Sequence, residues 1–355
     1  MFFMCGIAGW LNFNSDISNN EKIFNAMSDT LVRRGPDSGG AYISKNVALI
    51  HRRLAVVDLE GGAQPMYKTY NEREYIIVYN GELYNSDDLR TELSEYGISF
   101  NSHSDTEAVL SSYIIWGDKC PEHLNGIFAF AIYDKHRRRL FCARDRAGVK
   151  PFFYHMGNDG FIFGSEISTL LSHPSVPHTI DSNGIGEIFL IGPGRTPGHS
   201  AFSAISELKP GEYAVYDESG FKKQAYWELK AAEHTDTPEE TAEHVRFLLT
   251  DSIKRQLVSD VPLCCFLSGG LDSSIISSVA ASEYQKSNHT LTTYSVDYVD
   301  NEKYFKANVF QPNSDDHYID IMSKSIGSRH NKVILDNSDV ADALYPATLA
   351  RSLPG

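Results

Sequence analysis

The segment "LSGGLDSS" (267–274) is the feature that most restricts the fold, because it joins the apolar strand "VPLCCFL" directly to the helix "SSIISSVAASEYQ". Helices and strands alternate around it from about residue 238 to the end of the chain. Strands that alternate with helices form a parallel sheet, so we expect a doubly wound α/β domain over 238–355. Three strands make a narrow sheet for such a fold, which predicts that this domain is incomplete at its C-terminal end.

The residue types of this segment favour a phosphate site. Two glycines let the backbone turn sharply and approach a ligand, and the free N–H groups of the following helix attract an anion. Ser268 and Ser273 add hydroxyl donors, and Asp272 beside a phosphate indicates a shared Mg²⁺ ion. The alternative is a plain helix N-cap after a tight turn. The motif lacks the lysine of the P-loop and is not G-x-G-x-x-G.

The chain before this domain has a different pattern. Short apolar runs bounded by Gly, Asn or Asp recur over the first 215 or so residues, and only a few helical patterns interrupt them. Many strands with few helices predict a layered α+β domain, which we place at 5–216. Residues 217–237 are polar and turn-rich, and we expect a linker there.

Cys5, in "MFFMCGIAGW", is either a buried strand residue or a nucleophile. A nucleophilic thiol with an ordinary pKa of about 8.5 needs a base, and no family-specific cysteine-protease signature surrounds it. The other available base is the residue's own α-amine, which requires Cys5 to be the first residue. This predicts that translation starts at Met4, or that a short propeptide is removed.

Four further motifs carry the polar groups that a free amino acid needs. A basic residue pairs with an α-carboxylate, a carboxylate with an α-ammonium, and an Asn side chain with a Gly N–H forms an oxyanion hole. Each residue alone has a structural explanation, since Asn-Gly is common in hairpins and strand arginines are usually solvated. The motifs are "RRGPDSGG" (33–40), "HRRLAVVD" (51–58), "YNGELYN" (79–85) and "SHSDTEAV" (102–109).

Together these motifs resemble the class II glutamine amidotransferases, and with "LSGGLDSS" they resemble the glutamine-hydrolysing asparagine synthetases. The resemblance also covers "RDRAGVKPFFY" (144–154) and "FGSEI" (163–167), although Arg33 stands where the family has His. It implies an α+β N-terminal-nucleophile hydrolase sandwich (αββα) followed by an α/β doubly wound ATP-pyrophosphatase domain of the adenine nucleotide alpha hydrolase type.

The same resemblance implies site roles by position. Cys5 would attack the glutamine amide carbon, and Asn80 with Gly81 would form the oxyanion hole. Arg53 would bind the α-carboxylate with backbone from the Arg53–Val57 strand nearby, Glu82 and Asp105 the α-ammonium, and Arg34 would help to close the pocket. The implied glutamine-binding residues are Arg34, Arg53, Leu54, Ala55, Val56, Val57, Asn80, Gly81, Glu82 and Asp105. The implied ATP-binding residues are Leu267, Ser268, Gly269, Gly270, Asp272, Ser273 and Val296, with Asp272 also a Mg²⁺ ligand.

The implied reaction is synthesis of asparagine from aspartate, with ammonia from glutamine and with ATP and Mg²⁺ as a substrate complex. It passes through a γ-glutamyl thioester and β-aspartyl-AMP, and no tightly bound cofactor is expected. Two alternatives stay open. One is a related glutamine-dependent amidotransferase or a β-lactam-synthetase-like ligase that acts on another carboxylate. The other is a truncated glutaminase or regulatory fragment that makes no asparagine.

Composition narrows the partners and the compartment. The net charge of −14 disfavours nucleic-acid and membrane partners, and no apolar run is long enough to predict a membrane span. Five cysteines without Cys-x-x-Cys favour a reducing, cytoplasmic location. We expect Cys264 and Cys265 to be buried strand residues. Glutamine, aspartate and ATP are the expected small-molecule partners, and a homodimer is the expected assembly.

Overall fold

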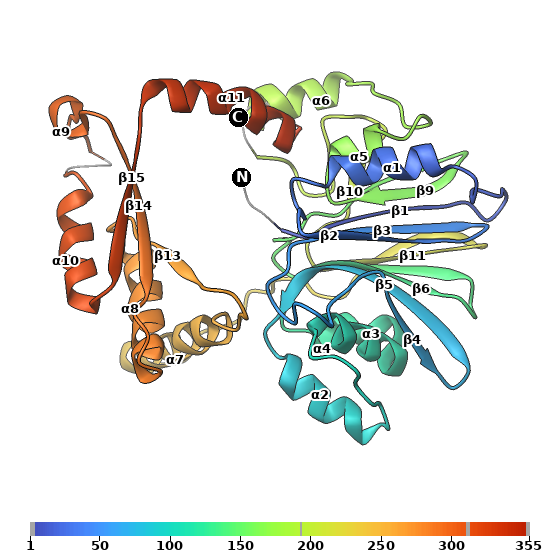
Figure 1. The fold of residues 1–355 in the computed structure, drawn as a ribbon, viewed down its shortest axis with the longest axis horizontal. Helices are drawn as coiled ribbons and strands as arrows, with labels where there is room; N and C mark the ends of the chain where they lie inside the picture. The colour runs from blue at the N-terminus through green and yellow to red at the C-terminus, as the bar shows by residue number, and fades with distance from the viewer. Residues whose placement is uncertain (1–3, 192–193, 310–312, 353–355) are drawn as a thin grey trace. The chain divides into compact units, whose positions relative to one another are not determined.

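The computed structural model describes residues 4–191, 194–309 and 313–352. The chain divides into two units, with a boundary between Lys230 and Ala231, and the second unit extends to Leu344 (Figure 1). In the described part of the chain, no helix combines the length and the apolar character that a membrane crossing needs.

Two six-stranded sheets form the centre of the first unit. Neighbouring strands within each sheet are antiparallel. The first sheet has the order β10 (Ser206–Glu207), β8 (Phe153–Gly157), β9 (Gly160–Gly164), β1 (Gly6–Leu11), β3 (Val47–Arg53), β2 (Ser38–Ile43). The second has the order β12 (Gly220–Ala225), β11 (Glu212–Asp217), β7 (Arg139–Arg144), β6 (Gly126–Asp134), β5 (Arg73–Leu83), β4 (Met66–Tyr70).

Helices cover the outer faces of both sheets, as Figure 1 shows. The first sheet packs against α1 (Glu21–Thr30) and α5 (Ile167–Leu171), and the second against α2 (Ser86–Glu95), α3 (Asp105–Trp116) and α4 (Cys120–His123). Other helical segments described in this unit are η1 (Gly117–Lys119), α6 (Ser182–Gly186) and η2 (Glu187–Ile191). This four-layer order confirms the predicted αββα sandwich.

The alternation of side chains along β1 explains why the strand is buried on both faces. Ile7 and Leu11 belong to the core between the two sheets, whereas Ala8 and Trp10 belong to the core under α1 and α5. Successive side chains of a strand point to opposite faces, so an apolar run such as "GIAGWL" fits only a strand enclosed by two layers. Cys5 directly precedes this strand, and its backbone is therefore anchored by a strand that is buried along its whole length.

The second unit contains a parallel sheet of β13 (Cys264–Phe266), β14 (Thr292–Tyr298) and β15 (Arg329–Leu335). Its helices are α7 (Pro238–Arg255), α8 (Leu271–Lys286), α9 (Asn301–Tyr304) and α10 (Asp316–Ile326), and the chain then enters α11 (Asn337–Arg351). A capping box of Thr237 and Glu240 starts α7, as expected for "TPEE". The predicted strand–helix alternation and parallel pairing are confirmed.

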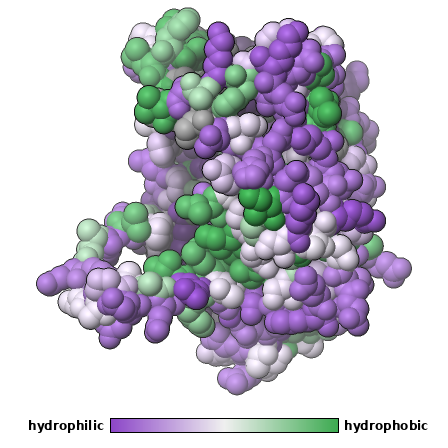
Figure 2. All heavy atoms as spheres, turned by 90° about the vertical axis from the view of Figure 1, so that its left-hand side faces the viewer, coloured by the Kyte–Doolittle hydropathy of each residue, from purple (hydrophilic) through white to green (hydrophobic). Residues whose placement is uncertain are grey.

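Figure 2 shows apolar residues, in green, at the surface of one side of the molecule.

Two sequence expectations differ from the structure. Residues 220–225 of the expected linker form β12, which pairs with β11 because Glu218 and Ser219 make a tight reversal between the two strands. The expectation that Cys264 and Cys265 are both buried is wrong. Cys265 packs on the α8 side of the sheet and is half-buried, whereas Cys264 points to the opposite face and is exposed.

Candidate active site

Cys5 lies in a pocket of the first unit to which residues from five separate stretches of sequence contribute. Nine of the predicted site residues line it, and Ala55 and Arg34 do not. The lining residues are Met4, Cys5, Arg53, Leu54, Val56, Val57, Gly62, Gln64, Tyr79, Asn80, Gly81, Glu82, Ser104, Asp105, Thr106 and Lys150. The fold thus brings three of the four sequence motifs into this pocket, because β3 and β5 end beside Cys5 and α3 starts beside it. The fourth motif, "RRGPDSGG", contributes no lining residue.

The Cys5 thiol is held by the backbone of Leu54. Its Sγ accepts a hydrogen bond from Leu54 N at 3.4 Å and donates to Leu54 O at 3.5 Å. Burial raises the pKa of the thiol above its ordinary value, although the Leu54 hydrogen bond, Lys150 and Arg53 act in the opposite direction. The thiol therefore needs a base. His51 cannot serve, because burial lowers its pKa to about 3 and its Nε2 bonds Tyr79 O at 3.1 Å.

Asn80 and Gly81 lie inside β5 and not in a hairpin, where they pair with Ala129 and Phe128 of β6. The Asn80 side chain is 1% exposed, and its Nδ2 has no hydrogen-bond partner among the described residues. A buried amide donor without a partner is costly, which points to a ligand oxygen as its partner. At Gly81 a Cβ would lie 2.5 Å from Ile127 O, so only glycine permits this close approach of strands.

Arg53 ends β3, and the expectation of a strand from Arg53 to Val57 is wrong: Leu54–Val57 is a loop. The loop leaves the sheet because the Arg53 guanidinium holds its far end, donating to Val57 O (3.2 Å), Asp58 O (2.6 Å) and Leu59 O (2.8 Å). Arg53 thus shapes the pocket wall while still lining the pocket. Ala55 instead donates its N–H to Asp37 Oδ2 at 2.8 Å, outside the pocket.

Asp105 is the first residue of α3, and Ser104 caps that helix by accepting from Thr106 N. Asp105 Oδ2 accepts hydrogen bonds from the Tyr79 hydroxyl at 3.0 Å and from Leu83 N at 3.1 Å. Burial raises the pKa of Asp105 to about 6, since these hydrogen bonds offset desolvation only in part. With Glu82 on the same wall, the pocket offers two carboxyl groups to an ammonium group.

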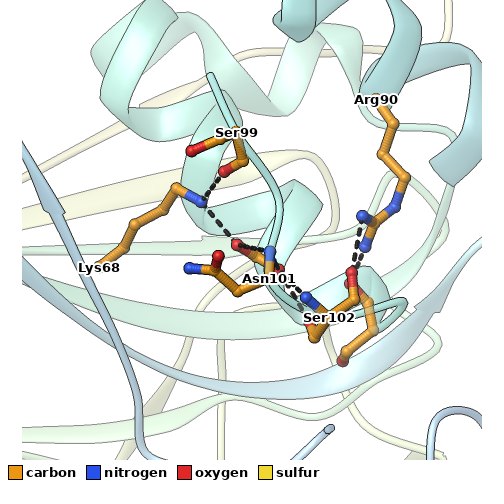
Figure 3. A network of polar contacts seen from close by, with 7 residues as sticks. Lys68, Arg90, Ser99, Asn101 and Ser102 are labelled. Atoms are coloured by element: carbon orange, nitrogen blue, oxygen red, sulfur yellow. Dashed lines mark hydrogen bonds and ion pairs between the residues drawn. The ribbon is translucent and has the colours of Figure 1, made fainter.

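A buried polar network fixes the segment before Asp105 (Figure 3). Lys68 from β4 donates to Glu107 Oε1 at 2.6 Å and to Ser99 O at 2.7 Å. Glu107 also accepts from the backbone N–H groups of Asn101 and Ser102. Arg90 of α2 donates to Ser102 O and Ser104 O. The network explains why α3 starts at a fixed position relative to β4 and α2.

Arg34 acts on the backbone of Cys5. Its Nε donates to Cys5 O at 3.1 Å, and its Nη1 pairs with Glu166 Oε1 at 3.5 Å. The backbone N–H of Met4 in turn donates to Arg34 O at 2.9 Å. The turn "RGPD" therefore fixes the direction in which Cys5 enters the pocket. The expectation that translation starts at Met4 concerns Met1–Phe3, and these residues lie outside the described part of the chain.

A second pocket lies in the second unit at the carboxyl ends of β13 and β14, where parallel sheets usually bind ligands. Three of the predicted ATP-binding residues line it: Leu267, Ser268 and Val296. Gly269, Gly270, Asp272 and Ser273 do not line this pocket, and they form the adjoining turn and first turn of α8. The other lining residues are Phe266, Tyr294, Ser295, Asp297, Tyr298, Asn301, Phe305, Ser314, Asp315, Asp316 and Ile319.

The turn between β13 and α8 is tightly organised. Gly269 has a φ of +77°, and a Cβ there would lie 3.0 Å from Asp315 O, so the position requires glycine. Ser268 N donates to Ser273 Oγ at 3.2 Å, and the two hydroxyl oxygens lie 3.0 Å apart. Asp272 is exposed in the first turn of α8. The turn thus combines two hydroxyls, a helix N-terminus and an exposed carboxylate within a few residues.

Comparison with known families agrees with this geometry. A family described as "Glutamine amidotransferase domain" matches residues 4–227, which is the region that builds the Cys5 pocket. The chain belongs to the glutamine amidotransferase family. A second family, "Asparagine synthase", matches residues 244–355 and so covers the region of the second pocket. The predicted combination of the two domain types is therefore confirmed.

Three curated relatives extend the comparison. The chain is 47% identical over 353 residues to asparagine synthetase (glutamine-hydrolyzing) 3 of Bacillus subtilis strain 168, covering 99% of this chain and 58% of that protein. It is 33% identical over 300 residues to asparagine synthetase 1 of the same strain, covering 82% and 46%. It is 32% identical over 283 residues to asparagine synthetase B of Escherichia coli K12, covering 78% and 44%. The chain thus spans about half the length of these relatives.

Several residues of the Cys5 pocket were not predicted from the sequence. Gln64 accepts from Tyr79 N at 2.6 Å, and the Tyr79 hydroxyl orients Asp105. Lys150 also lines the pocket, and it lies within "RDRAGVKPFFY". That motif supplied a usable signal, since a lysine in a segment shared with a family of this kind is a candidate for the site.

Proposed function

We propose that this protein makes asparagine from aspartate, with ammonia released from glutamine at the Cys5 pocket. The observation that carries the proposal is the meeting of three groups in one pocket: the Cys5 thiol, the unpartnered Asn80 amide and the Asp105 carboxyl. These match the nucleophile, the oxyanion donor and the ammonium ligand that hydrolysis of a free amino-acid amide requires.

In the first half-reaction, the Cys5 α-amine takes the thiol proton and Sγ attacks the side-chain amide carbon of glutamine. Asn80 Nδ2 and Gly81 N–H donate to the developing oxyanion, and the amine returns the proton to the departing ammonia. Water then hydrolyses the γ-glutamyl thioester to glutamate. Arg53 binds the α-carboxylate, and Glu82 with Asp105 the α-ammonium. The free amine requires that Met4 no longer precedes Cys5.

In the second half-reaction, a β-carboxylate oxygen of aspartate attacks the α-phosphorus of ATP, and pyrophosphate leaves. Ammonia then attacks the β-aspartyl carbonyl carbon and displaces AMP. Leu267 and Val296 border the nucleoside, while Ser268, Gly269, Gly270 and Ser273 hold the phosphates. Mg²⁺ arrives with ATP and neutralises phosphate charge, and the exposed Asp272 carboxylate is the ligand that this turn supplies.

The test separates the two halves. Glutamate release from glutamine should be abolished in Cys5→Ala, while pyrophosphate release with aspartate and ammonium chloride should continue. Gly270→Ser is the opposite control: it should lower pyrophosphate release and leave glutaminase activity intact. Glutaminase activity in Cys5→Ala would contradict the first half. Pyrophosphate release with another carboxylate and none with aspartate would contradict the choice of acceptor. A cytoplasmic homodimer without nucleic-acid or membrane partners stays a prediction.

A further inference from the structure

Lys150 places an ammonium group in the nucleophile pocket. It follows β7 in the segment Arg144–Lys150, whose backbone is fixed: Lys150 N donates to Asp145 Oδ2 at 3.0 Å, and Lys150 O accepts from Arg144 Nε at 2.8 Å. The residue is 4% exposed and lines the pocket beside Cys5. Its Nζ donates to Met4 Sδ at 3.0 Å, and a thioether is a weak acceptor. The side chain is thus held at the residue that precedes the nucleophile.

The other charged groups around Cys5 already have partners or lie on the substrate side. Arg34 pairs with Glu166, and Arg53 holds the carbonyls of the 57–59 loop. Among the described residues, Lys150 makes no ion pair. The ionisable groups that act on Cys5 or Lys150 are Arg34, Arg53, Tyr79, Glu82, Asp105 and Asp145.

We propose that Lys150 is a positioning residue for glutamine hydrolysis, whose charge keeps the α-amine of Cys5 in its unprotonated form. This rests on the proposed function, because it assumes that the amine of Cys5 is free. Once Met4 is absent, Lys150 loses its thioether partner and faces the new amine. A like charge within about 4–6 Å disfavours protonation of an amine, and the same charge favours the thiolate.

Burial lowers the pKa of Lys150 itself, while Glu82 and Cys5 oppose that change. The carboxylate of Glu82 therefore supports the charged form of Lys150 in the empty pocket. When glutamine binds, its ammonium group pairs with Glu82 and Asp105, which leaves Lys150 to act on Cys5. Lys150 makes no bond to the substrate's reacting atoms and acts only on Cys5, through its amine and its thiol.

The experiment measures kcat/KM for glutamate release between pH 5.5 and 9. Lys150→Met keeps the side-chain length without the charge, Lys150→Gln is a second neutral variant, and Lys150→Arg keeps the charge. Lys135→Met is the matched control, since it removes one exposed lysine of the same unit outside the pocket. Thermal denaturation of each variant confirms that it is folded.

The acid limb of the profile reports the free enzyme's base. We expect the two neutral variants to shift this limb upward by about one pH unit or more, which is a loss of about tenfold at low pH. Lys150→Arg and Lys135→Met should keep the wild-type limb. An unshifted limb, or the same fractional loss at every pH, would overturn the role of Lys150. Glutaminase activity that survives Cys5→Ala would instead overturn the proposed function.

Discussion

Replacing Asn80 by Ala should separate catalysis from stability. In the proposed mechanism its Nδ2 donates to the oxyanion, and loss of one such donor typically lowers kcat about 100- to 1,000-fold. In the free protein that Nδ2 has no partner among the described residues, so its removal breaks no hydrogen bond. Removal of an unsatisfied buried donor relieves about 1–3 kcal/mol, which offsets the small cavity that is left. We therefore expect the free energy of unfolding to change by less than about 1 kcal/mol.

Asn46→Ala is the matched comparison for this prediction. The Asn46 Nδ2 donates to Asn12 O at 2.8 Å and to Ser15 O at 2.9 Å, away from the pocket. This variant should lose about 1–2 kcal/mol of stability and keep its kcat. The assays are steady-state glutamate release and urea denaturation. A kcat for Asn80→Ala within fivefold of wild type, or a stability loss as large as that of Asn46→Ala, would contradict the role of Asn80 as an oxyanion donor.

Three further variants test other parts of the structure. Asp105→Asn should raise the glutamine KM yet stabilise the fold above pH 6 by about 3 kcal/mol, because a carboxyl pKa raised from 3.8 to about 6 makes ionisation unfavourable. That gain should appear between pH 4 and 6 in urea titrations and vanish below pH 4; a pH-independent difference would contradict it. Glu107→Gln leaves the Lys68 ammonium without its carboxylate, so it should lower the free energy of unfolding by about 3 kcal/mol. It should also raise the glutamine KM more than it lowers kcat. An unchanged KM would show that the network does not position the site. Gly269→Ala should weaken ATP-dependent pyrophosphate release and leave glutaminase activity unchanged, and equal loss of both activities would count against the assignment.

The sequence predicted the parts of the fold and site that depend on local pattern. The apolar run of β1, the Asp105 helix start and the glycine-rich turn each carry their structural cause within a few residues. Cys5, Asn80 and Asp105 could be predicted because each lies in a short motif whose chemistry is specific. β12 was missed because its residues are polar, and only pairing with β11 makes them a strand.

The missed pocket residues depend on contacts between distant segments. Gln64 lies in the pocket because its side-chain oxygen accepts the hydrogen bond of Tyr79 N, in place of a backbone oxygen from a neighbouring strand. The periodicity of the sequence does not reveal this contact. Lys150 reaches Met4 across 146 positions of sequence. Cys264 is exposed because α8 covers the opposite face of the three-stranded sheet. The sequence shows only an apolar run and does not show which face is covered. Burial of a single strand residue is therefore a tertiary property.

The central claim is that Cys5, with a free α-amine, is the nucleophile. The most direct measurement is peptide mass spectrometry of active enzyme after inactivation with a thiol-alkylating glutamine analogue. We expect one label, on Cys5, in a peptide whose first residue is Cys5. A labelled Cys5 still preceded by Met4 would contradict the free-amine mechanism, and a label on another residue would contradict the choice of nucleophile.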